Sequence, residues 1–155
     1  MDWFSQFLLK LKNHEGLRLK PYDDTRGIKT IGYGMNLEAG FDAEEQKYIK
    51  AQNITFDHGI TWAQAEWFLE HRARMAVNAA QAYFKGFVTL SDNRKIALAD
   101  MAYNLGYPRL CQFKLLLKAL QKGDFQNAGT QMLSSAWAKQ VGSRALELAN
   151  MMRNG

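Results

Sequence analysis

The apolar residues near the N-terminus recur at the spacing of a helix. They lie at positions i, i+3, i+4 and i+7, and they are Phe4, Phe7, Leu8 and Leu11. This pattern predicts a short amphipathic helix that ends near Asn13. Farther along, residues 18–22 and 28–34 form two short runs around the turn-forming run Asp23-Asp24-Thr25-Arg26-Gly27. Two such runs joined by a turn predict a small antiparallel ribbon.

The remainder of the chain has the patterns of helices. A short helix is expected at residues 42–51, and Thr61 followed by Gln64 has the signature of a capping box. The helix that begins there is expected to continue to about Phe84, because neither proline nor glycine interrupts it. Further helices are predicted at residues 91–105, 113–121, 124–134 and 143–153.

These elements predict a single α+β domain with two lobes. The small lobe holds the ribbon and covers about residues 14–60, and the larger, all-helical lobe combines residues 1–13 with residues 85–155. A connecting helix over residues 61–84 would span roughly 35 Å, about the width of a small domain. The helix at 91–105 is apolar on nearly every side, which is typical of a helix in the core.

The composition indicates a folded protein without a membrane-spanning segment. A chain of 155 residues with 47% hydrophobic residues is typical of one globular domain. Its apolar runs are far shorter than the ~20 residues of a membrane span, so no stable membrane insertion is expected. The first residues lack the features of a signal peptide, and we therefore expect synthesis in a cytoplasm.

The cysteine and histidine residues do not indicate a thiol or metal site. Cys111 is the only cysteine, so the chain has no internal disulfide. All three histidines precede it, which is the reverse of the papain-like order. The chain has no C-x-x-C, no H-E-x-x-H and no pair of histidines at helical spacing. We therefore expect no metal and no cofactor.

Positive charge is concentrated in the second part of the chain. The net charge is +5, of which residues 1–60 contribute −1 and residues 61–155 contribute +6. Such asymmetry is compatible with an anionic polymer as partner, either nucleic acid or bacterial cell wall. It is equally compatible with a basic surface that only keeps the protein soluble. No nucleic-acid recognition motif is present, so no nucleic-acid partner is expected.

The ribbon segment contains the side chains best suited to catalysis. Cleavage of a glycosidic bond requires one acid that protonates the leaving oxygen and one carboxylate that activates water or attacks carbon. Glu15 follows the N-terminal helix, where partial burial would favour its protonated form, and Asp24 lies nine residues later in a polar turn. Thr30, on the returning strand, could hold a water with its hydroxyl. Taken alone, Glu15 could be a surface charge and Asp24 a turn former, and the neighbouring Asp23 is expected to form turn hydrogen bonds.

The same segment resembles the active-site segment of phage-type (T4-like) lysozymes. Their signature is E-G-x-x-L-x-x-Y-x-D-x-x-G-x-x-T-x-G-x-G, and every fixed position is met between Glu15 and Gly34. The resemblance covers nearly the whole chain and implies a lysozyme-like fold and the activity of a muramidase. Its further matching positions are Gly59-Ile60-Thr61, Asn93-Arg94, Asn104-Leu105-Gly106, Phe113, Trp137 and Arg144.

The resemblance also implies roles for individual residues. It makes Glu15 the general acid, Asp24 the base and Thr30 the residue that positions water, with inversion at the anomeric carbon. It implies that Arg144 pairs with the Glu15 carboxylate. The remaining substrate-binding or supporting residues that it implies are Leu37, Tyr103, Asn104 and Gln131.

The implied function is that of an endolysin. It would cleave the β-1,4 bond between N-acetylmuramic acid and N-acetylglucosamine in peptidoglycan, its expected partner. We expect a monomer, made in the cytoplasm of a bacterial host, that acts on the cell wall after release. A separate holin-like partner would be needed if the protein serves host lysis.

Two other functions are compatible with this sequence, and two residues depart from the family pattern. A lytic transglycosylase would use one carboxyl group and form an anhydro sugar, and Asp24 with Thr30 favours water as the acceptor instead. A catalytically idle wall-binding or virion module of the same fold is the other alternative, because fold alone does not fix function. Met35 and Leu116 depart from the pattern of the best-known relative and could alter substrate preference.

Overall fold

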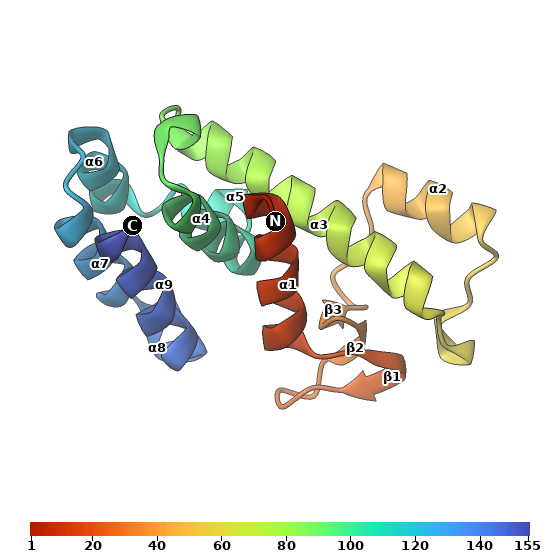
Figure 1. The fold of residues 1–155 in the computed structure, drawn as a ribbon. Coiled ribbons are helices and arrows are strands. Elements are labelled where there is room, and N and C mark those ends of the chain that lie inside the picture. The colour runs from red at the N-terminus through yellow and green to blue at the C-terminus, as the bar shows by residue number, and fades with distance from the viewer. The chain divides into compact units, whose positions relative to one another are not determined.

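The computed structural model describes residues 1–155 and has an α+β fold (Figure 1). Its three strands are β1 (Arg18–Asp23), β2 (Lys29–Gly32) and β3 (Met35–Asn36), and short 3-10 helices lie at η1 (Phe56–His58) and η2 (Phe87–Thr89). The helices are α1 (Trp3–Glu15), α2 (Ala43–Ala51), α3 (Trp62–Tyr83), α4 (Asp92–Leu105), α5 (Tyr107–Leu110), α6 (Lys114–Lys122), α7 (Phe125–Leu133), α8 (Ala136–Val141) and α9 (Ser143–Asn154). The predicted fold class is confirmed. None of the helices combines the length and the apolar character needed to cross a membrane.

The chain divides into two compact units. One, the helical unit, comprises residues 1–7 and 73–155, and the other, the sheet unit, comprises residues 8–72. Helices α1 and α3 each contribute residues to both units.

The sheet unit is built around the predicted ribbon. Strands β1, β2 and β3 form an antiparallel sheet in that order, with Tyr22 opposite Thr30 and Thr30 opposite Asn36. The ribbon prediction is confirmed, but β3 was not predicted, because a strand of two residues is too short for a periodic pattern. Phe41 and Phe56 stack with ring centroids 5.2 Å apart and extend the apolar core under α2 and α3.

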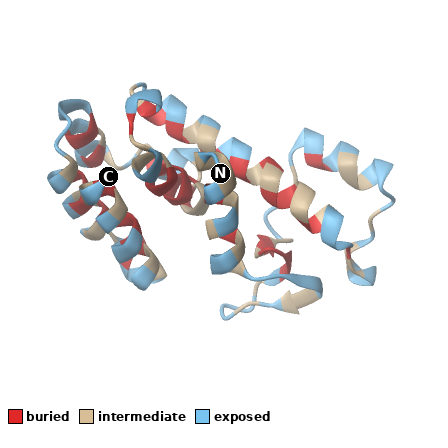
Figure 2. Cartoon of the chain, in the orientation of Figure 1, coloured by how far each residue is buried: buried red, intermediate tan, exposed pale blue.

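The helical unit has α4 at its centre. Eight of the residues of α4 are buried, and Figure 2 shows the red colour of buried residues along this helix. The prediction of a core helix apolar on nearly every side is therefore confirmed. Helix α9 buries one stripe along its length, formed by Ala145, Leu148, Ala149 and Met152.

Side-chain caps fix where several helices begin. The predicted capping box at α3 is present, because the Gln64 N–H donates to Thr61 Oγ1 and the Thr61 N–H donates to Gln64 Oε1. Ser91 caps α4 in the same manner through the Arg94 N–H. A second capping box, between Asp42 and Glu45 at α2, was not predicted. The short helices α5 and α8 were also missed, since four and six residues give little periodicity.

Candidate active site

Glu15 is the last residue of α1, and its carboxylate lies against the backbone of Gly34. The helix ends there because Gly16 follows with a φ of +68°. A Cβ atom on Gly34 would lie 2.3 Å from Glu15 Oε2, and Gly34 itself has a φ of +68°. Gly34, the last glycine of the motif, is thus needed for two reasons: its backbone is left-handed, and a side chain there would overlap the Glu15 carboxylate. Glu15 is partly buried.

Asp24 begins the turn between β1 and β2, and backbone donors fix its side chain. Its Oδ1 accepts hydrogen bonds from the N–H groups of Arg26, at 2.8 Å, and Ile28, at 2.9 Å. Its own N–H donates to the Ile28 carbonyl, and its carbonyl accepts from the Gly27 N–H. The carboxylate is therefore held in one orientation, with Oδ2 left for a ligand.

The turn hydrogen bonds predicted for Asp23 are made by Asp24 instead. Asp23 is the last residue of β1, where it lies opposite Lys29 in the ladder and is exposed. A side chain that caps a turn must lie at the first position of the turn, and Asp24 occupies that position. The prediction for Asp23 was wrong by one residue.

Thr30 lies on β2 and is only 4% exposed. Its hydroxyl donates to the Ile28 carbonyl at 2.8 Å. The proton of Thr30 is therefore committed to the backbone, and Oγ1 can only accept a hydrogen bond from a bound molecule. Leu37 follows β3, donates its N–H to the Lys29 carbonyl and is partly buried.

In the helical unit, Arg144 forms an ion pair with Asp100. The Asp100 side chain is completely buried in α4, and its Oδ1 lies 3.0 Å from Arg144 Nε and 2.7 Å from Nη2. Asn104, one turn later, donates to the carbonyl of Asp100 at 3.0 Å and to its Oδ1 at 3.1 Å. Sequence reasoning missed Asp100, although a lone acid within an apolar helix is a signal that it needs a buried partner.

Gln131 and Leu116 line a cavity of about 410 Å³ in the helical unit. Leu116 is buried, and Gln131 is partly buried and donates from Nε2 to Asn127 Oδ1. The indole of Trp137 also lines this cavity, and its Nε1 is buried without a hydrogen-bond partner. The cavity thus has an amide and apolar side chains in its lining, a combination that suits a ligand with both polar and apolar faces.

The site residues expected from the sequence fall into both units. Glu15, Asp24, Thr30 and Leu37 belong to the sheet unit. The other four belong to the helical unit, with Tyr103 partly buried in the last turns of α4, and they are Tyr103, Asn104, Gln131 and Arg144.

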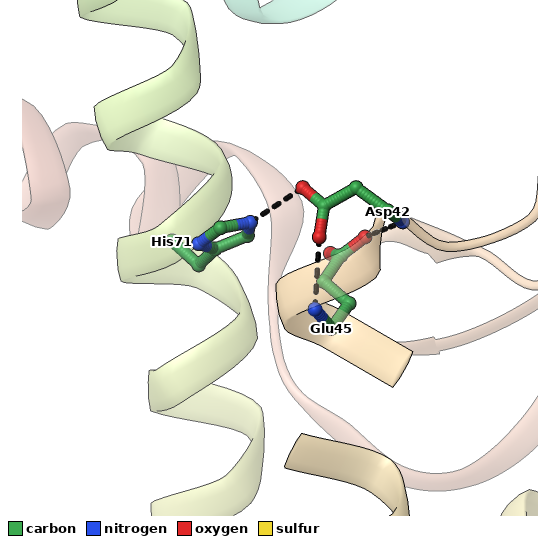
Figure 3. Close-up of side chains that lie close together, drawn as sticks. All are labelled: Asp42, Glu45 and His71. Carbon is green, nitrogen blue, oxygen red and sulfur yellow. Dashed lines mark hydrogen bonds and ion pairs between the residues drawn. The ribbon is translucent and has the colours of Figure 1, made fainter. Parts of the chain in front are cut away.

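The sheet unit also has a cluster of metal-ligand types away from the ribbon, formed by Asp42, Glu45 and His71 (Figure 3). The polar groups of this cluster already form hydrogen bonds and ion pairs with one another and with Arg72. Asp42 Oδ1 accepts the Glu45 N–H, Asp42 Oδ2 lies 2.6 Å from His71 Nε2, and Arg72 Nε donates to Glu45 Oε2 at 2.8 Å. A cation would compete with Arg72 and with the capping box, so the arrangement fits an ion-pair network that joins α2 to α3.

Hydrogen bonds control the ionisation of Asp42 in this cluster. Burial alone would raise the pKa of Asp42, but the Glu45 N–H and the His71 ring together lower the pKa below its ordinary value. The ionised carboxylate is thus the form that caps α2.

Comparisons with known proteins cover nearly the whole chain. The family model for phage lysozyme matches residues 12–153. Probable T4-type lysozyme 2 of Dictyostelium discoideum is 26% identical over 94% of this chain and 92% of its own length. An endolysin of Acyrthosiphon pisum secondary endosymbiont phage 1 is 29% identical over 88% of this chain and 82% of its own length.

A third relative is a phage spike protein, and the match covers only part of it. The pre-baseplate central spike protein of Enterobacteria phage T4 is 29% identical over 94% of this chain, and the match covers 27% of the spike protein. The family match and the ribbon motif agree with each other and with the α+β fold. This chain belongs to the phage lysozyme family, a family of bacteriolytic glycoside hydrolases that act on peptidoglycan.

Proposed function

We propose that this protein is a muramidase that cleaves the β-1,4 bond between N-acetylmuramic acid and N-acetylglucosamine with inversion. The observation that carries the proposal is the complete motif around Glu15, Asp24 and Thr30, in a chain that matches the phage lysozyme family over residues 12–153. The hydrogen bonds that fix Asp24 and Thr30 support it, because acid–base catalysis depends on fixed geometry.

In this proposal the leaving oxygen takes its proton from Glu15. The close approach of Gly34 limits where the Glu15 carboxyl group can move, which supports a role as a positioned acid. As the glycosidic bond breaks, positive charge develops at the anomeric carbon, and water attacks from the opposite face of the sugar.

Asp24 and Thr30 would together orient that water. Water can donate one proton to Asp24 Oδ2 and the other to Thr30 Oγ1, since the Thr30 hydroxyl already donates to Ile28. A lone pair of the water then faces the anomeric carbon. Asp24 accepts the proton as the bond to carbon forms, and the product has the opposite anomeric configuration.

The helical unit would contribute binding groups. Arg144 would pair with the Glu15 carboxylate, as the family resemblance implies, while Asp100 accepts from the guanidinium and Asn104 in turn donates to Asp100. Tyr103, Asn104 and Gln131 would contact the saccharide, and Leu37 would support it from the sheet unit. Leu116 forms part of the cavity wall that Gln131 also lines, and it would restrict which substituents of the saccharide fit there.

The same catalysis could serve two biological settings. Release through a holin-like partner after synthesis in the host cytoplasm would make the protein an endolysin, the name that one of the relatives carries. The spike-protein relative favours a second candidate, a wall-cutting module of a virion. In either setting we propose that the protein acts on the wall as a monomer.

Mass spectrometry of digested peptidoglycan tests the proposal. Hydrolysis gives muropeptides with reducing ends, a lytic transglycosylase gives anhydro ends, and an inactive module gives no fragments. We expect reducing N-acetylmuramic acid ends, and no fragments from Glu15→Gln. Anhydro ends, or unchanged digestion by a folded Glu15→Gln variant, would contradict the proposal.

A further inference from the structure

The exposed face of α6 carries a row of lysines. Lys114, Lys118 and Lys122 are spaced by four residues, so they lie within an arc of about 80° and extend over roughly 12 Å along the helix. All three are exposed, and none forms an ion pair. We call these three residues the lysine row.

The lysine row works against the stability of its own helix. Like charges four residues apart repel one another, and Lys114 in the first turn opposes the helix dipole. The N-cap residue Phe113 offers no side-chain acceptor. The opposite face of α6 buries Leu116, Ala119 and Leu120, so the residues that pack this helix against the unit lie away from the lysine row.

Acidic side chains of the helical unit do not neutralise this row. The unit has eleven basic and five acidic side chains, a net charge of +6, whereas the sheet unit has a net charge of −1. Three of the five acids have other tasks. Asp2 and Asp124 cap α1 and α7, and Asp100 is buried with Arg144.

The row extends between two cavities of the helical unit. Lys114 lines the cavity that also contains Gln131, and Lys122 lines a second cavity of about 590 Å³. Lys85 is another exposed cation at the second cavity, which has no acidic side chain in its lining. A long anionic chain bound at the first cavity could therefore continue along the lysine row of α6, between two cavities whose linings contain no acidic side chain.

We propose that the lysine row binds the carboxylates of the peptides in peptidoglycan and tethers the enzyme to its polymeric substrate. This inference rests on the proposed function, because it takes peptidoglycan as the partner. The charge sign, the absence of internal ion pairs and the position beside the cavity with Gln131 favour a linear polyanion that is also the substrate. The tether would act on polymer and have no effect on a small fragment.

The test uses binding without cleavage. In a Glu15→Gln background, the triple variant Lys114→Gln/Lys118→Gln/Lys122→Gln is compared with the unchanged lysines by cosedimentation with purified sacculi, free of teichoic acid and lipid. We expect about tenfold weaker binding at 50 mM salt, and a difference that nearly disappears at 500 mM, because exposed charges are screened. Amidation of the sacculus carboxylates should abolish the same difference.

A matched triple variant controls for net charge. Lys20→Gln/Lys47→Gln/Lys50→Gln removes three exposed lysines from the sheet unit, and its binding should change little. Equal losses in both triple variants would overturn the proposal, as would a difference that persists on amidated sacculi. A loss of binding to DNA or anionic vesicles, with none to sacculi, would also overturn it.

Failure of the tether and failure of the proposed function give different results. If Glu15→Gln still cleaves sacculi, the catalytic proposal fails, whatever the binding data. If the catalytic proposal holds and the lysine row has no effect on binding, only the tether fails. With Glu15 intact, the triple variant should cleave a short soluble peptidoglycan oligosaccharide whose carboxylates are all amidated as fast as the parent.

Discussion

Asp24 and Asp100 are held in opposite ways, and the contrast separates chemistry from stability. Asp24 lies in a partly exposed turn and is fixed by the N–H groups of residues two and four positions later. Asp100 is fully buried and is fixed by Arg144, forty-four residues away. Local bonds leave one oxygen of Asp24 available for substrate, whereas the Asp100 pair contributes to the core. We therefore expect activity to depend on Asp24 and stability on Asp100.

The largest expected effect is on activity in Asp24→Asn. The amide oxygen can still accept both N–H groups, so the turn should persist, but the base is lost. We expect hydrolysis of sacculi to fall by roughly 10²–10⁴-fold with little change in Tm. Turbidity clearance and thermal unfolding measure the two quantities. A folded variant with a tenth of the parent's activity would show that Asp24 is not the base.

The next largest effect is on stability in Asp100→Asn. This change leaves Arg144 facing a neutral partner at a buried site, which typically costs about 3–5 kcal/mol in the free energy of unfolding. Denaturant unfolding measures it. Asp57→Asn is the matched control, because the Asp57–Lys29 pair is exposed, and we expect little change there. Similar losses in both variants would show that burial does not distinguish the two pairs.

Gly34→Ala tests the close approach between Gly34 and the Glu15 carboxylate. An alanine at a φ of +68° costs roughly 1–2 kcal/mol of backbone strain, and its Cβ would also displace the Glu15 carboxylate. Gly40→Ala is the matched control, since Gly40 has a φ of +83° with open space around it. We expect similar destabilisation from both, with a loss of activity in Gly34→Ala alone. Equal activity in the two variants would contradict the contact with Glu15.

The smallest effect concerns pH and Asp42. The folded state lowers the pKa of Asp42, so its stabilising contribution is complete above the ordinary Asp pKa and is lost as pH falls through the lowered pKa. The difference in unfolding free energy between the parent and Asp42→Asn should therefore shrink as pH is lowered from about 5 to below 3. A difference that is constant across this range would contradict the ionised cap.

The sequence predicted the parts of the structure that depend on local patterns. Helical spacing located α1, α3 and α4, and a turn between two short runs located the ribbon. The capping signature of Thr61 was correct, since a cap involves residues only three positions apart. The motif around Glu15 was visible because all of its fixed positions lie in one continuous stretch, from Glu15 to Gly34.

Features that depend on tertiary contacts could not be predicted in this way. The partner of Asp100 lies on another helix, and no local pattern links it to Arg144. The direction of the Thr30 hydrogen bond depends on the position of the Ile28 carbonyl in the turn. The cavity beside Trp137 is formed by five helices and the segments between them, so its lining follows from packing.

The anomeric configuration of the first product distinguishes an inverting reaction from a retaining one. Proton NMR of a soluble peptidoglycan oligosaccharide, recorded before mutarotation, identifies the anomer that the enzyme releases. Attack by water held between Asp24 and Thr30 predicts inversion, so the α anomer should appear first from the β-linked substrate. Release of the β anomer first would mean a retaining reaction, and would contradict the assignment of Asp24 as the base and Thr30 as its partner.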